Sequence, residues 1–107
     1  MDIERSGLLG DLLEPGEVVE LQAQAGDTTI AVTNRRLAVL DAERVALAVD
    51  IDHIRRVQFD IEKTRPATLV IVPERPDDAP QVLAVPAEQY EPVAAALVSI
   101  GRRLAGA

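Results

Sequence analysis

The hydrophobic residues of this chain follow two different periods, and the change between them limits what the chain can fold into. Between residues 17 and 86, apolar side chains alternate with polar ones, as in strands that bury one face. The run Val45, Leu47 and Val49 is one example. Turns at roughly 8–12-residue spacing separate about seven such runs, a pattern typical of antiparallel sandwiches and barrels. We therefore predict a mainly β domain.

After residue 86 the period becomes helical. The apolar residues there are three or four positions apart and form one stripe, with Ala94, Val98 and Gly101 beside it: Tyr90, Val93, Leu97, Ile100 and Leu104. We expect a helix over residues 88–105 that lays this stripe on the sheet. Pro92 belongs in its first turn, where the missing N–H of proline costs least.

The first 14 residues also have helical spacing. Their apolar edge is predicted to be an interface and is formed by Leu8, Leu9, Leu12 and Leu13. Pro15-Gly16 ends the helix expected over residues 2–14. Acidic residues outnumber Arg5 on this segment, whereas membrane-surface helices are usually basic. The edge is therefore expected to pack on its own barrel or on a second subunit.

The amino-acid composition argues against several classes of function. The chain has 107 residues, enough for a single domain over 1–107, with 48% hydrophobic but only 2% aromatic residues. Base-stacking surfaces therefore lack their side chains. Cysteine is absent, which excludes disulfides and thiolate metal sites. The net charge of −7 argues against nucleic-acid binding. With no signal-peptide pattern and no long apolar run, the expected compartment is the cytoplasm.

Three short motifs occur in a recognisable order. They are LEPGEV at 13–18, VTNRRL at 32–37 and VDIDHI at 49–54. The series resembles the bacterial pleckstrin-homology-like family, which is related in shape to GRAM domains. The resemblance covers roughly residues 13–104. It implies a strongly bent antiparallel sheet of about seven strands, with the final helix closing one end of a split barrel.

Each motif also has a local physical interpretation. Asn34 tolerates a positive φ better than most residues, so it suits a tight hairpin. Thr33 can hydrogen-bond the backbone of the same turn. Ile51 and Ile54 are three apart and are predicted to cap the barrel mouth from one helical turn.

The chain departs from relatives of this shape at two places. Many pleckstrin-homology domains have a tryptophan in the final helix, and here Tyr90 or Leu97 must fill that space. Phosphoinositide-binding members place Lys and Arg around the first hairpin loop. That loop reads Ala25-Gly26-Asp27 in this sequence, which is short and acidic and argues against phosphoinositide binding.

Residues for catalysis are sparse. The only histidine, His53, is interpreted as an exposed turn residue, and the serines, Ser6 and Ser99, lie on helices at opposite ends of the chain. Nothing marks an acidic residue as buried. Two close acid pairs lack the ligand count and the glycine of a calcium loop and are interpreted as solvated loop residues: Asp50 with Asp52, and Asp77 with Asp78. We expect no enzyme activity, no cofactor and no metal site.

Four arginines are candidates for contact with an anion or a partner: Arg35, Arg36, Arg55 and Arg56. Acidic residues close to them in sequence favour a salt-bridged surface over an anion site: Asp41, Glu43, Asp60 and Glu62. The pattern as a whole predicts a non-catalytic binding module. It would present a sheet edge, a groove beside the final helix or an oligomer interface to a protein partner or to its own copies. The alternatives are a peripheral domain that binds lipid headgroups and, with least support, a small enzyme.

Overall fold

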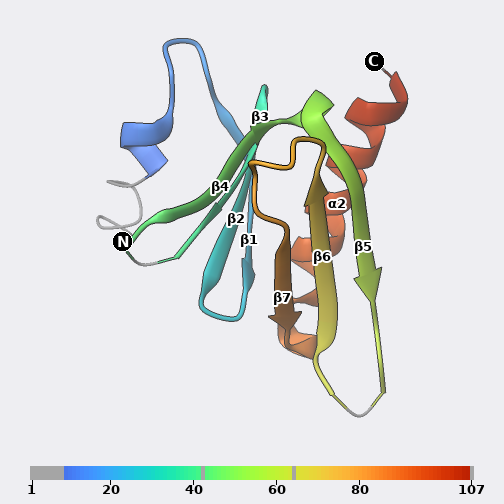
Figure 1. Ribbon diagram of the computed structural model, residues 1–107. Coiled ribbons are helices and arrows are strands. Elements are labelled where there is room, and N and C mark those ends of the chain that lie inside the picture. The colour runs from blue at the N-terminus through green and yellow to red at the C-terminus, as the bar shows by residue number, and fades with distance from the viewer. Residues whose placement is uncertain (1–8, 42, 64, 107) are drawn as a thin grey trace.

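The computed structural model describes residues 9–41, 43–63 and 65–106 (Figure 1). Its described residues form seven strands, which confirms the predicted mainly β architecture. They are β1 (Val19–Ala25), β2 (Thr28–Thr33), β3 (Arg36–Leu40), β4 (Val45–Asp50), β5 (Ile54–Asp60), β6 (Ala67–Pro73) and β7 (Gln81–Val85). Strands β1–β4 form one antiparallel sheet in sequence order, and β5–β7 form a second. The long helix α2 (Tyr90–Gly106) follows the short 3-10 helix η2 (Ala87–Gln89).

The two sheets enclose an aliphatic core. The inward positions of the first sheet alternate along the strands, as in Ile30 and Val32 on β2 and Leu37 and Val39 on β3. Buried residues of the second sheet, such as Leu69, belong to the same cluster. The alternation predicted from sequence is therefore the inward face of a closed core, built almost without aromatic rings.

Strands β2 and β3 are buried on their outer faces as well. Ala31 and Ala38 are paired across the two strands, and both are fully buried. Together with Leu40 they form a second cluster with Leu9, a leucine of the N-terminal segment. Because alanine has a short side chain, this part of the sheet lets the N-terminal segment approach closely.

The N-terminal segment is described only from residue 9. Residues 9–12 are helical. Residues 13 and 14 are not, so the helix ends two residues before the predicted end, and the predicted part before residue 9, including Leu8, lies outside the described residues. Leu9 is buried, and Leu12 and Leu13 pack against the same cluster. These three leucines therefore contact their own sheet, which was one of the two arrangements expected.

Helix α2 covers the core with a face slightly different from the one expected. Val93, Ala96 and Ile100 are fully buried, with Tyr90 and Leu97 partly buried beside them. Ala96, and not Ala94, thus continues the stripe, and Leu104 is 39% exposed. A helix turns about 100° per residue, so one face of a straight helix drifts from a strict 3–4 repeat. Pro92 lies in the first turn, as predicted.

Two further predictions concern the ends of the barrel. The 3-10 helix η1 (Ile51–His53) joins the sheets, and Ile51 and Ile54 are both buried, as expected for a cap. Tyr90 packs edge-to-face on Phe59 with ring centroids 5.7 Å apart. These two rings are the only aromatic side chains of the chain, so Tyr90 supplies the aromatic contact of the final helix.

Candidate functional site

A buried carboxylate joins the motifs at 13–18 and 32–37. Glu17 Oε2 accepts hydrogen bonds from Thr33 Oγ1 at 2.7 Å and Arg36 Nε at 2.9 Å. Its Oε1 accepts from Arg36 Nη2 at 2.6 Å and from the backbone N–H of Glu14 at 3.0 Å. Arg36 Nη2 also donates to the carbonyl oxygen of Leu12. The expectation that no acidic residue is buried was therefore wrong for Glu17.

Glu17 and Arg36 each stabilise the charged form of the other. Hydrogen bonds, from Arg36 above all and also from the Thr33 hydroxyl, lower the pKa of Glu17 to about 2 against the opposing effect of burial. Glu17 in turn raises the pKa of Arg36 above its usual value. Because both groups are charged, neutralised and hydrogen-bonded, this cluster is a structural clamp and does not offer a free charge to a ligand.

The turn at 33–36 is organised by side chains. Thr33 Oγ1 accepts from the backbone N–H of Arg35 and Arg36, which confirms its predicted local hydrogen bonding. The predicted positive φ at Asn34 was wrong, since no described non-glycine residue has one. Asn34 instead accepts from the N–H of Val18 and donates to the carbonyl of Gly16. Its amide thus ties two turns together.

The four candidate arginines lie in different environments. Arg36 is bonded to Glu17, and Arg35 pairs with Glu14 at 2.7 Å on the surface. Both glutamates come from the 13–18 motif. Neither is among the acidic residues that were expected to neutralise these arginines because they lie close in sequence. Arg55 and Arg56 are exposed on β5, in the other sheet, and form no ion pair within the described chain. The four therefore do not share one anion site.

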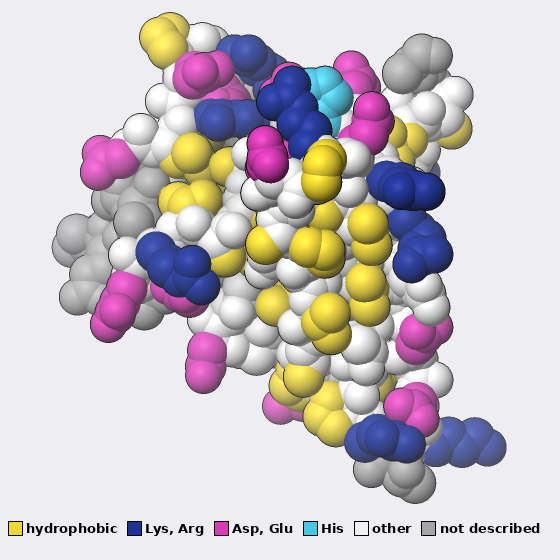
Figure 2. All heavy atoms as spheres, in the orientation of Figure 1, with side chains coloured by type: hydrophobic (Ala, Val, Ile, Leu, Met, Phe, Trp, Pro, Cys, Tyr) yellow, Lys and Arg dark blue, Asp and Glu magenta, His cyan; other side chains and the backbone are white. Residues whose placement is uncertain are grey.

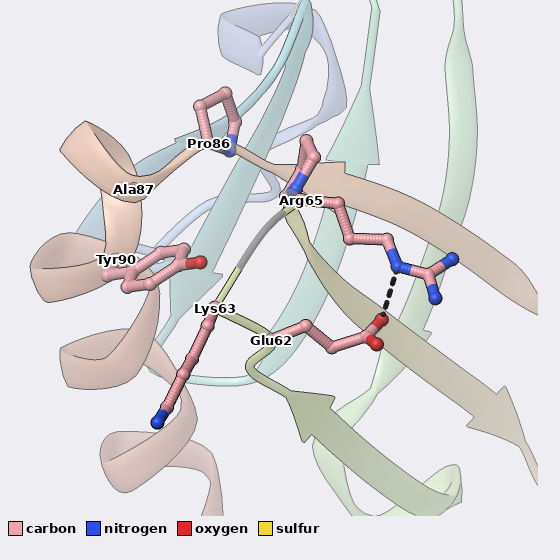
Figure 3. A pocket seen from close by; sticks show the side chains of 7 residues that line it. Glu62, Lys63, Arg65, Pro86, Ala87 and Tyr90 are labelled. Carbon is pink, nitrogen blue, oxygen red and sulfur yellow. Dashed lines mark ion pairs between the residues drawn. The ribbon is translucent and has the colours of Figure 1, made fainter.

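A hollow of about 390 Å³ lies between the β5–β6 connection and the start of α2 (Figure 3). Its lining includes Lys63, Pro66, Pro86 and Ala87, and the Tyr90 ring projects toward it from the α2 side. Arg65 forms an ion pair with Glu62 at 3.2 Å. In Figure 3 the ends of Lys63 and Arg65 both point away from Tyr90. The hollow therefore lacks the converging cations that an anion site needs.

Two smaller hollows also show no feature that marks a ligand site. One, of about 280 Å³, lies where Gln89 accepts a hydrogen bond from the N–H of Gly26. The other, of about 260 Å³, lies beside Arg103, which donates to the carbonyls of Thr33 and Asn34 and so attaches α2 to the β2–β3 turn. Within the described ranges, no three His, Asp or Glu side chains gather as a metal-ion site would need. His53 lies in η1 and is half-buried, and not fully exposed as the sequence suggested.

The outer face of the β5–β7 sheet carries apolar side chains that are exposed or only partly buried. Val70, Val72 and Val82 point outward there, and Val82 is 68% exposed. Figure 2 shows hydrophobic side chains gathered over β6 and β7, with basic side chains along the β5 margin. β5 borders this face and is an edge strand, paired with β6 alone. Contiguous exposed apolar surface of this kind commonly marks a contact site.

The backbone groups on the unpaired side of β5 are also available to another strand. Within the described chain, residues 55–60 form no backbone hydrogen bond other than those of their pairing with β6. Unpaired N–H and C=O groups along an edge can pair with another strand. The alternating pattern predicted strand β5, but only the sheet order reveals that it is an edge.

None of the helices in the described residues has both the length and the apolar character needed to cross a bilayer. No family model and no curated protein sequence matches this chain. Its structure is similar to the crystal structure of a pleckstrin homology domain from Shewanella amazonensis, with a TM-score of 0.71 and 17% sequence identity. The match covers 95% of this chain and 96% of that one. The chain therefore has a pleckstrin-homology-like fold.

Proposed function

We propose that this protein is a non-catalytic interaction module that acts through protein–protein contacts or self-association. The observation that carries the proposal is the free edge of β5, with its unpaired backbone groups beside an exposed apolar face. An added strand would satisfy the backbone groups of that edge, and side chains on the same face would give selectivity.

The buried clamp supports this assignment indirectly. Glu17 and Arg36 fix the N-terminal segment on the outer face of the first sheet, where Leu9 covers Ala31 and Ala38. That face is already occupied by the chain itself. The outer face of the second sheet has no such cover among the described residues, so it remains for a partner.

Binding of lipid headgroups has less support. The first hairpin turn contains Gly26 and Asp27 in place of basic residues, and Arg35 and Arg36 are each paired with a glutamate. The net charge of −7 also opposes attraction to an anionic surface. We therefore place the contact at β5 and not at the hairpin loops.

A photo-crosslinking amino acid at position 58, on the exposed face of β5, should give a covalent protein adduct in cells that produce this chain. The same amino acid at position 98, an exposed valine of α2, is the matched control and should give little adduct. The adducts are detected on denaturing gels and identified by mass spectrometry. The proposal fails if position 58 gives no adduct, or no more than position 98.

A further inference from the structure

The exposed side chains of β5 are complementary to themselves. Arg56, Gln58 and Asp60 oppose Val72, Val70 and Thr68 of β6, so the three share the outer face of the sheet. All three are exposed. Read in either direction, this row has Gln58 at its centre and opposite charges at equal distances from it.

We infer that a second copy of this chain is the partner of β5, paired antiparallel about a two-fold axis at Gln58; this rests on the proposed function of the β5 edge. Side chains directly opposite in an antiparallel pair share a face. A two-fold axis perpendicular to the sheet must therefore set one residue against its own copy. With Gln58 at that position, Arg56 of each copy faces Asp60 of the other.

The neighbouring registers lack this match. An axis at Val57 sets Arg56 against Gln58 and leaves Asp60 without a cation opposite. An axis at Phe59 sets Arg56 against Glu62, which lies beyond the strand and already pairs with Arg65. Opposite charges directly across a strand pair stabilise it, whereas like charges disfavour it. The Gln58 register is therefore the preferred one.

The inner face of β5 is compatible with the same register. Val57 of one copy would face Phe59 of the other, and both are only partly buried in the single chain. Pairs of aromatic and β-branched residues are favourable across antiparallel strands. The product is a continuous sheet of six strands, in which the valine-bearing faces of both copies lie on the same side.

Strand β4, the outer strand of the first sheet, offers no such match. Its residues Val45–Asp50 include a single charged side chain, Asp50, so two-fold pairing there would form no ion pair. The charge pattern thus selects β5 over β4. Because a seven-residue edge is a small contact, the dimer is expected to be weak and to depend on concentration.

Charge-reversal substitutions test both whether the partner is a second copy and whether the pairing is centred on Gln58. Sedimentation equilibrium of the wild-type chain should move from 11.5 kDa toward twice that mass as concentration rises. Arg56→Asp and Asp60→Arg should each weaken self-association by roughly tenfold or more, because each turns two attractive pairs into repulsive ones. An equimolar mixture of these two variants should associate again, since every facing pair then joins opposite charges. Arg102→Asp, with the same charge change on α2, should behave as the wild type.

A disulfide provides a second, independent readout. The chain has no cysteine, so Gln58→Cys introduces a single thiol that would face its own copy. Cα atoms opposite in an antiparallel pair are about 4.5–5.5 Å apart, within disulfide range. Gln58→Cys should therefore oxidise to a covalent dimer much faster than Asp60→Cys, whose two thiols would lie four residues apart along the strands.

Three outcomes would overturn the inference: a wild-type chain that stays at 11.5 kDa at every concentration, variants that associate as the wild type does, or equal oxidation of the two cysteine variants. Its failure is separable from failure of the proposed function. If the chain is monomeric while the crosslinker at position 58 joins it to a different protein, the inference that the partner is a second copy is wrong, but the interaction role stands. If position 58 gives no adduct at all, both fail.

Discussion

Replacing Glu17 with glutamine is expected to lower the free energy of unfolding by about 3 kcal/mol, near the lower end of the cost of breaking a buried ion pair. The Glu17 side chain is fully buried and Arg36 is 16% exposed, so the guanidinium would lose its counter-charge in a poorly solvated place. Urea unfolding at neutral pH measures the change. The control is Glu14→Gln, whose pair with Arg35 is half exposed and should cost less than about 1 kcal/mol.

The same pair predicts how this difference varies with pH. The pKa of Glu17 is about 2 in the folded chain against 4.5 for an ordinary glutamate, so the unfolded state binds the proton more readily. The stabilisation is therefore complete above pH 4.5 and is lost as pH falls toward 2. The gap in stability between wild type and Glu17→Gln should close over that interval. A constant gap, or a cost no larger than that of Glu14→Gln, would contradict the clamp.

Truncating Ile100 to alanine is expected to cost about 2–5 kcal/mol, the range for large-to-small changes in a packed core. Ile100 is 1% exposed and lies on the face of α2 that covers the sheets. The matched control is Val98→Ala on the same helix. Its side chain is 53% exposed, so this change should cost only about a few tenths of a kcal/mol. Denaturant unfolding of both variants measures the difference. Equal small effects would mean that α2 does not pack on the barrel as described.

The fold was predictable where burial follows a strict period. The alternating residues between 17 and 86 identified the seven strands, because each strand buries one face in a common core. The prediction was less exact where a helix drifts from its repeat, so Ala96 is buried where Ala94 was expected beside the stripe. For β2 and β3, alternation did not reveal that the outer face is covered by Leu9.

The candidate site was harder to predict, because it depends on contacts between distant residues. Glu17 and Arg36 are 19 positions apart, and Glu17 looks like a solvated residue just before a strand. The motifs at 13–18 and 32–37 were the available signal, but their residues gave no partner. Arg56, Gln58 and Asp60 could be placed on one face from alternation. Only the sheet order shows that this face adjoins a free edge.

Hydrogen exchange of the backbone amides at low and high protein concentration tests the role of β5 most directly. We predict that exchange within residues 55–60 slows as concentration rises, because a second strand would then protect the outward N–H groups. Strand β4 should show no such change. Protection that appears at β4 instead, or exchange along β5 that is the same at every concentration, would contradict self-association through this edge.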